Sequence, residues 1–290
     1  MNRSSQRGKI RQFLWCMAPS IVILALQNAA VVFGSQVYVV WMFWQAHGDI
    51  DGFGERFSKG LTSADFLMSV SLGYAAVGIL IFAVWYRSLK RKLGLRTDKD
   101  SLRGYPPYLF AGILLFAAAA QYVCEYLVVI LAKLQPDWLA WYEELIQSLN
   151  LSGQNADILV IAYTVFFGPV CEELCFRGLT FQLAGRILSP SMTNLIQALL
   201  FGGMHANPLQ SAYAFVFGWL LGQIYLETEN LAVTILIHIL FNGAGMCLTQ
   251  FIGVGTTPAT FFGILFASLS LAYCGFLLIR KAASVKSFEA

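Results

Sequence analysis

The sequence predicts an all-α fold, a polytopic bundle of about eight transmembrane helices that forms a single membrane domain over residues 1–290. Of the 290 residues, 58% are hydrophobic and only 12% are charged, whereas a soluble globular domain carries about 25% charged residues. The hydrophobic residues also fall into long runs, and a helix needs about 20 of them to cross a bilayer. We therefore expect membrane lipid to surround most of the chain.

Eight apolar segments are the predicted helices. The first is long enough for a tilted or bent helix, and the fifth is short, as is usual where a helix is broken or buried among others. In chain order they cover 13–45, 66–87, 106–133, 157–186, 191–206, 208–226, 231–251 and 256–280. Residues 137–150 mix aromatic and acidic side chains, which fits either an amphipathic helix at the membrane interface or a surface loop.

The basic residues predict how the chain is oriented in the membrane. They gather in the N-terminal tail, in the loop 87–103 and in the C-terminal tail, while the first and third loops are acidic. Lysine and arginine favour the cytoplasmic side, so we expect both termini there. The N-terminus resembles a signal peptide, but its apolar run is too long for one. The net charge of +3 is modest and indicates no nucleic-acid partner.

The fourth apolar segment contains three charges within six residues: Glu172, Glu173 and Arg177. Each charge at the centre of a membrane helix costs about 2–3 kcal/mol on insertion scales, so such residues indicate function. Glu173 and Arg177 are four residues apart and share a helix face, so Arg177 can neutralise and orient Glu173. Glu172 points about 100° away and is the better candidate for a general base. Pro169 can kink this helix and admit water.

Two histidines provide further candidates on later segments. His205 lies four residues after Phe201, and His238 lies four residues before Asn242, so each pair shares one helix face. A rise of about 1.5 Å per residue places Glu172, His205, His238 and Asn242 in overlapping middle layers of the bilayer. We therefore expect them to meet in one pocket.

Three other residues have more than one assignment from sequence. Glu125, in the third segment, either pairs with Lys133, reaches the outer interface or has a function. Cys171 and Cys175 flank the two glutamates, as small packing residues or as metal ligands or a redox pair. No loop carries a pair of cysteines, so we expect no extracellular disulfide.

Together these motifs resemble the CAAX protease and bacteriocin-processing family, also called the Abi family. The resemblance covers 157–245 and rests on Glu172-Glu173-x-x-x-Arg177, Phe201-x-x-x-His205 and His238-x-x-x-Asn242, in this order. It implies an intramembrane endopeptidase, in the plasma membrane of a prokaryote, that acts on a membrane-associated peptide or lipidated protein. It further implies that Glu172 activates water with the help of His205, that His238 and Asn242 stabilise the oxyanion, and that Glu173 and Arg177 support the site.

Whether the site holds a metal stays open at this point. Glu172, His205 and His238 are candidate ligands because two histidines and a glutamate can hold zinc with one open position. The chain lacks a His-Glu-x-x-His helix, so the ligands would come from three separate helices. The prediction is therefore either zinc or no metal.

Two other classes of function compete with the protease. A non-catalytic bacteriocin-immunity or peptide-binding protein would keep the fold and bind a peptide. An ion-coupled transporter would use intramembrane Glu, Arg and His as a relay, but the sequence shows no inverted repeat with paired broken helices. The sequence does not identify the substrate, the host or the oligomeric state.

Overall fold

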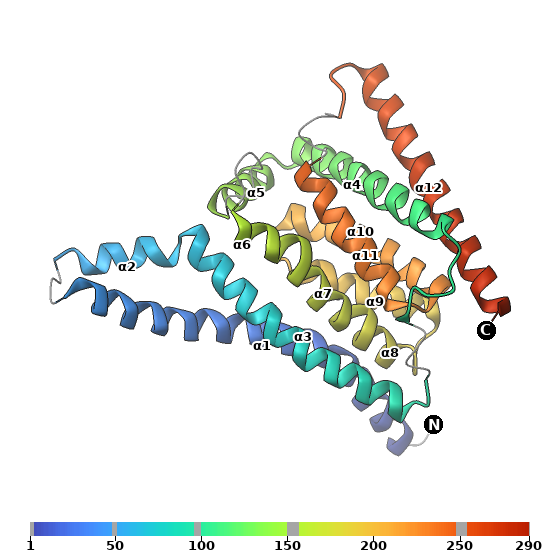
Figure 1. The fold of residues 1–290 in the computed structure, drawn as a ribbon, viewed down its shortest axis with the longest axis horizontal. Coiled ribbons are helices and arrows are strands. Elements are labelled where there is room, and N and C mark those ends of the chain that lie inside the picture. The colour runs from blue at the N-terminus through green and yellow to red at the C-terminus, as the bar shows by residue number, and fades with distance from the viewer. Residues whose placement is uncertain (1–2, 48–50, 96–99, 150–156, 248–253, 290) are drawn as a thin grey trace.

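The computed structural model describes residues 3–47, 51–95, 100–149, 157–247 and 254–289. The elements in these ranges are helices (Figure 1), which confirms the predicted all-α class. Each apolar segment predicted from sequence corresponds to a helix or to one continuous helical run; residues 248–251 of the seventh segment lie outside the described ranges.

The helices have the following bounds. Those that correspond to single predicted segments are α1 Arg3–Ala46, α3 Ala64–Lys92, α4 Tyr108–Leu134, α9 Pro190–Gly203, α10 Pro208–Thr228, α11 Leu231–Cys247 and α12 Pro258–Glu289. The fourth segment is a run of α6 Ile158–Ile161, η2 Ala162–Phe167, α7 Gly168–Glu173, η3 Leu174–Thr180 and α8 Phe181–Ala184. Two short helices, α2 Phe53–Leu61 and α5 Pro136–Ser148, lie between the longer ones. The stretch 136–148 is thus a helix and not an irregular loop.

Among the described residues, five helices are long and apolar enough to cross a membrane. They are Gln12–Ala46, Ala64–Lys92, Tyr108–Leu134, Ile158–Ala184 and Pro258–Lys286. Helix α11 is apolar but shorter, and α9 is only 14 residues long. The chain is therefore an integral membrane protein with at least these five candidate spans, and the predicted count of about eight is not established by helix length and composition.

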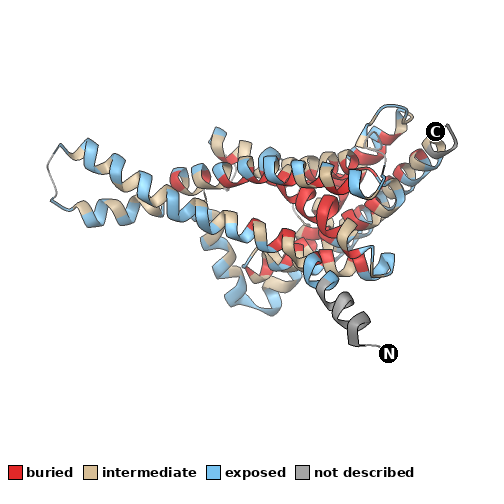
Figure 2. Ribbon diagram, turned by 90° about the horizontal axis from the view of Figure 1, so that it is seen from below, coloured by how far each residue is buried: buried red, intermediate tan, exposed pale blue. Residues whose placement is uncertain are grey.

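The helical run 158–184 occupies the centre of the bundle. It packs against α1 and α3 on one side and against α9 and α11 on the other, while α4 and α12 pack together beyond α11 (Figure 1). Figure 2 shows buried residues gathered in this body, whereas the end formed by α2 and the adjoining parts of α1 and α3 is largely exposed. The exposed side chains of α1 and α3 include Phe33, Trp44 and Leu80, as expected for surfaces in contact with lipid.

Small residues allow close contact between α4 and α12. A Cβ atom at Gly112 would lie 2.9 Å from the Cβ of Leu278, and one at Gly275 would lie 2.7 Å from the amide nitrogen of Phe116. Glycine at such positions lets helix backbones approach closely, which is a common way to associate helices in lipid.

The C-terminal helix and the loop after α3 meet at one end of the bundle. Lys286 Nζ donates a hydrogen bond to the Ser101 carbonyl at 2.7 Å, and the start of α1 lies at the same end (Figure 1). The three basic regions noted in the sequence therefore share one end of the molecule. Their location on the cytoplasmic side of the membrane stays a prediction.

Candidate active site

Pro169 gives the central run an irregular backbone next to the glutamates. The Gly168 N–H bonds the Tyr163 carbonyl, five residues back. The next bond of this π-helical pattern would join the Pro169 nitrogen to the Thr164 carbonyl, but proline has no N–H. The freed Thr164 carbonyl instead accepts a hydrogen bond from Asn242 Nδ2 at 2.7 Å. Pro169 thus creates the acceptor that orients Asn242, consistent with the frequent presence of π-bulges at functional sites.

Glu173 and Arg177 form a fully buried ion pair. Arg177 Nη1 donates to Glu173 Oε1 at 2.8 Å, with both side chains 0% exposed. Arg177 Nη2 also donates to the Gly218 carbonyl at 2.9 Å, and the guanidinium lies 4.7 Å from the centre of the Phe201 ring. The predicted i,i+4 contact is therefore made and is anchored to α9 and α10.

Position 218 has no room for a side chain, because Phe201 and Arg177 fill the space beside Gly218. A Cβ atom there would lie 2.8 Å from Phe201 Cδ1 and 3.4 Å from Arg177 Nη2. The glycine lets α10 bring its carbonyl within reach of the guanidinium.

His238 connects the buried ion pair to Glu172. Its Nδ1 lies 2.8 Å from Glu173 Oε1, and an ionised carboxylate only accepts, so Nδ1 carries the proton. The opposite ring nitrogen, Nε2, then lies 3.7 Å from Glu172 Oε2. Phe217 packs edge-on against the imidazole, with the ring centres 5.2 Å apart. The ring is therefore held with Nε2 directed at Glu172.

One cavity of about 310 Å³ brings four of the six predicted site residues together. Glu172, His205, His238 and Asn242 line it. Glu173 and Arg177 are not among its lining residues and lie behind His238. We call this space the catalytic cavity, after the role that we propose for it below. Helix α5 and the following Leu149 form part of its wall.

His205 lies just beyond the last turn of α9. Its Nδ1 is 2.8 Å from the Phe201 carbonyl, so Nδ1 donates and Nε2 of the neutral ring is an acceptor. Phe201 and His205, which are four residues apart in the sequence, are thus joined by a hydrogen bond from the His205 ring to the Phe201 carbonyl.

The proposed metal ligands do not form a zinc site in this arrangement. Among the described residues, no group of three or more His, Cys, Asp or Glu side chains is placed to hold a metal ion. A catalytic zinc usually takes three protein ligands. Glu172, His205 and His238 line the same cavity but do not converge in this way.

The two cysteines beside the glutamates are packing residues. Cys171 and Cys175 are free thiols, both 0% exposed, and belong to the hydrophobic core around the central run.

Sequence reasoning missed several polar groups around the site. Gln27 of α1 donates to the Tyr74 hydroxyl at 3.1 Å, and Tyr74 bonds Tyr163. Gln27 and Tyr163 line the catalytic cavity. An amide within the apolar first segment was the available signal for Gln27. The Thr164 carbonyl could be foreseen only by asking which backbone acceptor Pro169 leaves free.

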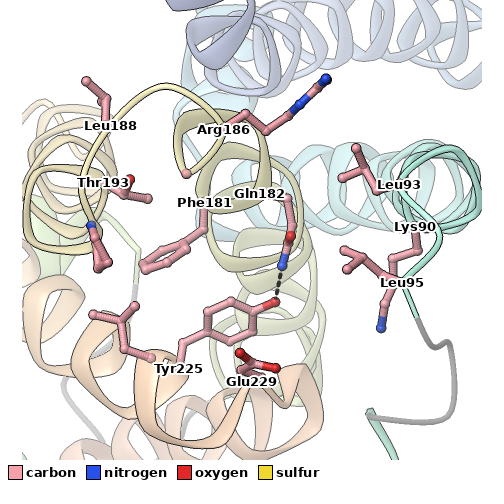
Figure 3. A pocket seen from close by; sticks show the side chains of 13 residues that line it. Lys90, Leu93, Leu95, Phe181, Gln182, Arg186, Leu188, Thr193, Tyr225 and Glu229 are labelled. Carbon is pink, nitrogen blue, oxygen red and sulfur yellow. Dashed lines mark hydrogen bonds between the residues drawn. The ribbon is translucent and has the colours of Figure 1, made fainter.

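A separate cavity of about 470 Å³ lies near the ends of α3, α8 and α10. Its wall includes Lys90, Arg186 and Glu229, and Gln182 donates to the Tyr225 hydroxyl across it at 2.7 Å (Figure 3). None of the six predicted site residues lines this cavity, so it is distinct from the site built around Glu172.

Comparison with known proteins supports the motif assignment. Residues 154–244 match the family model described as type II CAAX prenyl endopeptidase Rce1-like, and all six site residues lie within the match. No curated protein and no solved structure matches the chain. Residues 154–244 therefore form a domain that is similar to the Rce1-like type II CAAX prenyl endopeptidases, and this domain contains the three motifs found in the sequence.

Proposed function

We propose that this protein is an intramembrane endopeptidase that cleaves a membrane-associated peptide or protein with a water molecule activated by Glu172. One observation carries the proposal. Glu173 is neutralised by Arg177 and bonded to His238, whereas Glu172 faces the catalytic cavity with His238 Nε2 at 3.7 Å. Glu172 is thus the carboxylate of the pair that is placed to meet a substrate.

The geometry around Glu172 suits the two roles that the reaction needs. Glu172 acts in its ionised form, as a general base must. His238 is held by Glu173 through Nδ1, and a proton on its Nε2, 3.7 Å from Glu172, provides an N–H donor to the cavity.

The residues then divide the reaction between them. Glu172 takes a proton from water as the water oxygen attacks the peptide carbonyl carbon. His238 Nε2–H and the second amide N–H of Asn242 donate to the oxyanion, each contributing about 3 kcal/mol in a dry site. The C–N bond breaks as Glu172 passes its proton to the leaving nitrogen. His205 Nε2 accepts a hydrogen bond from the other O–H of the water and so holds the water molecule in place.

The test compares the wild type with Glu172→Gln in liposomes. Both are incubated with a library of membrane-anchored peptides, and products are identified by mass spectrometry, with and without a chelator. We expect cleavage by the wild type alone, unaffected by the chelator. Glu55→Gln, at an exposed ion pair of α2, is the matched control and should cleave normally. Equal cleavage by the wild type and Glu172→Gln would remove Glu172 from the role of base.

A further inference from the structure

A second cavity of about 300 Å³ adjoins the catalytic cavity. The two share Ile146, Thr164, Tyr213, Phe241 and Asn242 as lining residues. Asn242, which bonds Thr164, therefore stands at the boundary between them. We call this second space the side cavity. Its far wall is formed by α4, which brings Glu125 into the lining.

Glu125 has no cationic partner among the described residues. It takes part in none of their ion pairs, and Lys133, the partner considered from sequence, is exposed two turns further along α4. Residues 150–156 and 248–253, which follow α5 and α11 in the sequence, contain no lysine, arginine or histidine. A half-buried carboxylate in a membrane helix without a counter-charge is costly, so its retention points to a ligand that supplies one.

The other groups around Glu125 suit a cation. The rings of Tyr142 and Tyr213 meet edge-on with their centres 6.4 Å apart, and both line the side cavity with Phe241. Aromatic faces attract ammonium and guanidinium groups within about 6 Å. Val128 and Ile146 add apolar wall, along which a long methylene stem can lie while its charged end meets a carboxylate.

We propose that the side cavity is a substrate subsite for a lysine or arginine side chain next to the scissile bond, and that Glu125 determines this specificity. The inference rests on the proposed function, because the shared wall at Asn242 makes the side cavity a neighbour of the reacting carbonyl. A cationic side chain would form a charge-assisted hydrogen bond with Glu125. A neutral side chain would bury the carboxylate without a partner.

The test measures binding separately from cleavage. Glu172→Gln protein in nanodiscs is mixed with an equimolar pool of acyl-anchored peptides in which each lysine peptide has a norleucine twin. Retained peptides are quantified by mass spectrometry as the ratio of lysine to norleucine. The same pool is applied to Glu172→Gln/Glu125→Gln, which keeps the shape of the cavity, and to Glu172→Gln/Glu143→Gln, which removes a charge from the exposed face of α5.

We expect lysine peptides to be enriched about tenfold, the ratio for 1.4 kcal/mol. The enrichment should disappear with Glu125→Gln and persist with Glu143→Gln. A ratio that does not depend on Glu125, or a pool that shows no enrichment at all, would overturn the subsite. Wild-type cleavage of the same pool is recorded in parallel. Enrichment without wild-type cleavage would overturn the proposed function and leave the side cavity as a binding site for a cationic side chain.

Discussion

Two polar clusters in this bundle contain a carboxylate paired with a buried cation, and they differ in whether a further ionisable side chain faces a cavity. In the first, Asp100 receives Lys90 Nζ at 2.9 Å, the Tyr86 hydroxyl at 3.1 Å and the Leu231 N–H at 3.0 Å. Lys90 is only 4% exposed. These bonds join the loop after α3 to the first turn of α11, and the carboxylate directs no reactive group into the catalytic cavity.

The second cluster is built in a similar way around Glu173, with Arg177 and His238 as partners. Here one more carboxylate, Glu172, faces a cavity together with the free side of His238. An ionisable group inside a membrane bundle therefore does not indicate chemistry by itself. The two clusters differ in whether an ionisable side chain still faces a cavity after the carboxylate and the cation have paired.

The largest expected effect is on the rate, from Glu172→Gln. Removing a general base should lower kcat/KM by about 10²–10⁴-fold. The melting temperature in detergent should stay close to that of the wild type, because Glu172 is not part of the buried ion pair. The check is steady-state cleavage of a membrane-anchored peptide alongside a thermal melt. A large fall in melting temperature would instead show that Glu172 stabilises the fold.

Arg177→Met should act mainly on stability. It leaves Glu173 buried without its cation, and breaking a buried pair in this way costs about 3–5 kcal/mol. Thermal unfolding in detergent measures the loss. The double variant Glu173→Leu/Arg177→Met removes both charges and should recover part of the stability but not the activity, because His238 loses its orienting acceptor. Full activity in the double variant would contradict the positioning role.

Asn242→Leu should reduce kcat more than it changes KM. An oxyanion donor acts in the transition state, and losing one lowers kcat by about 10²–10³-fold. Asn242→Ser retains a donor and should be less impaired. A change confined to KM would instead make Asn242 a residue that only shapes the boundary with the side cavity.

The sequence predicted the helices better than the membrane spans. Long apolar runs locate helices because the core of a bilayer has no water to bond an irregular backbone. The number of crossings is harder to predict, since α9 and α11 are short and packed against other helices, where protein replaces lipid. Helix length then no longer has to match the bilayer.

At the site, residues on one helix were predictable and contacts between helices were not. The i,i+4 spacing was enough to pair Glu173 with Arg177. The contact of His238 with Glu173 joins residues 65 positions apart and depends on how α11 packs. The spacing placed His238 and Asn242 on one helix face, and the family resemblance implied that both are oxyanion donors. Neither indicated that His238 also links the two glutamates.

Asp100→Asn should have the smallest effect, and this effect should be on thermal stability and not on cleavage. Lys90 would keep an acceptor but lose its counter-charge, at a cost of about 1–3 kcal/mol. Cleavage per folded molecule should be unchanged, because Asp100 lies outside the catalytic cavity. Thermal melts and kinetics are compared with Asp65→Asn, a change at an exposed aspartate of α3. If Asp100→Asn abolished cleavage while the protein stayed folded, the two clusters would be coupled through α11. An ionisable group that is fully paired could then no longer be classed as purely structural.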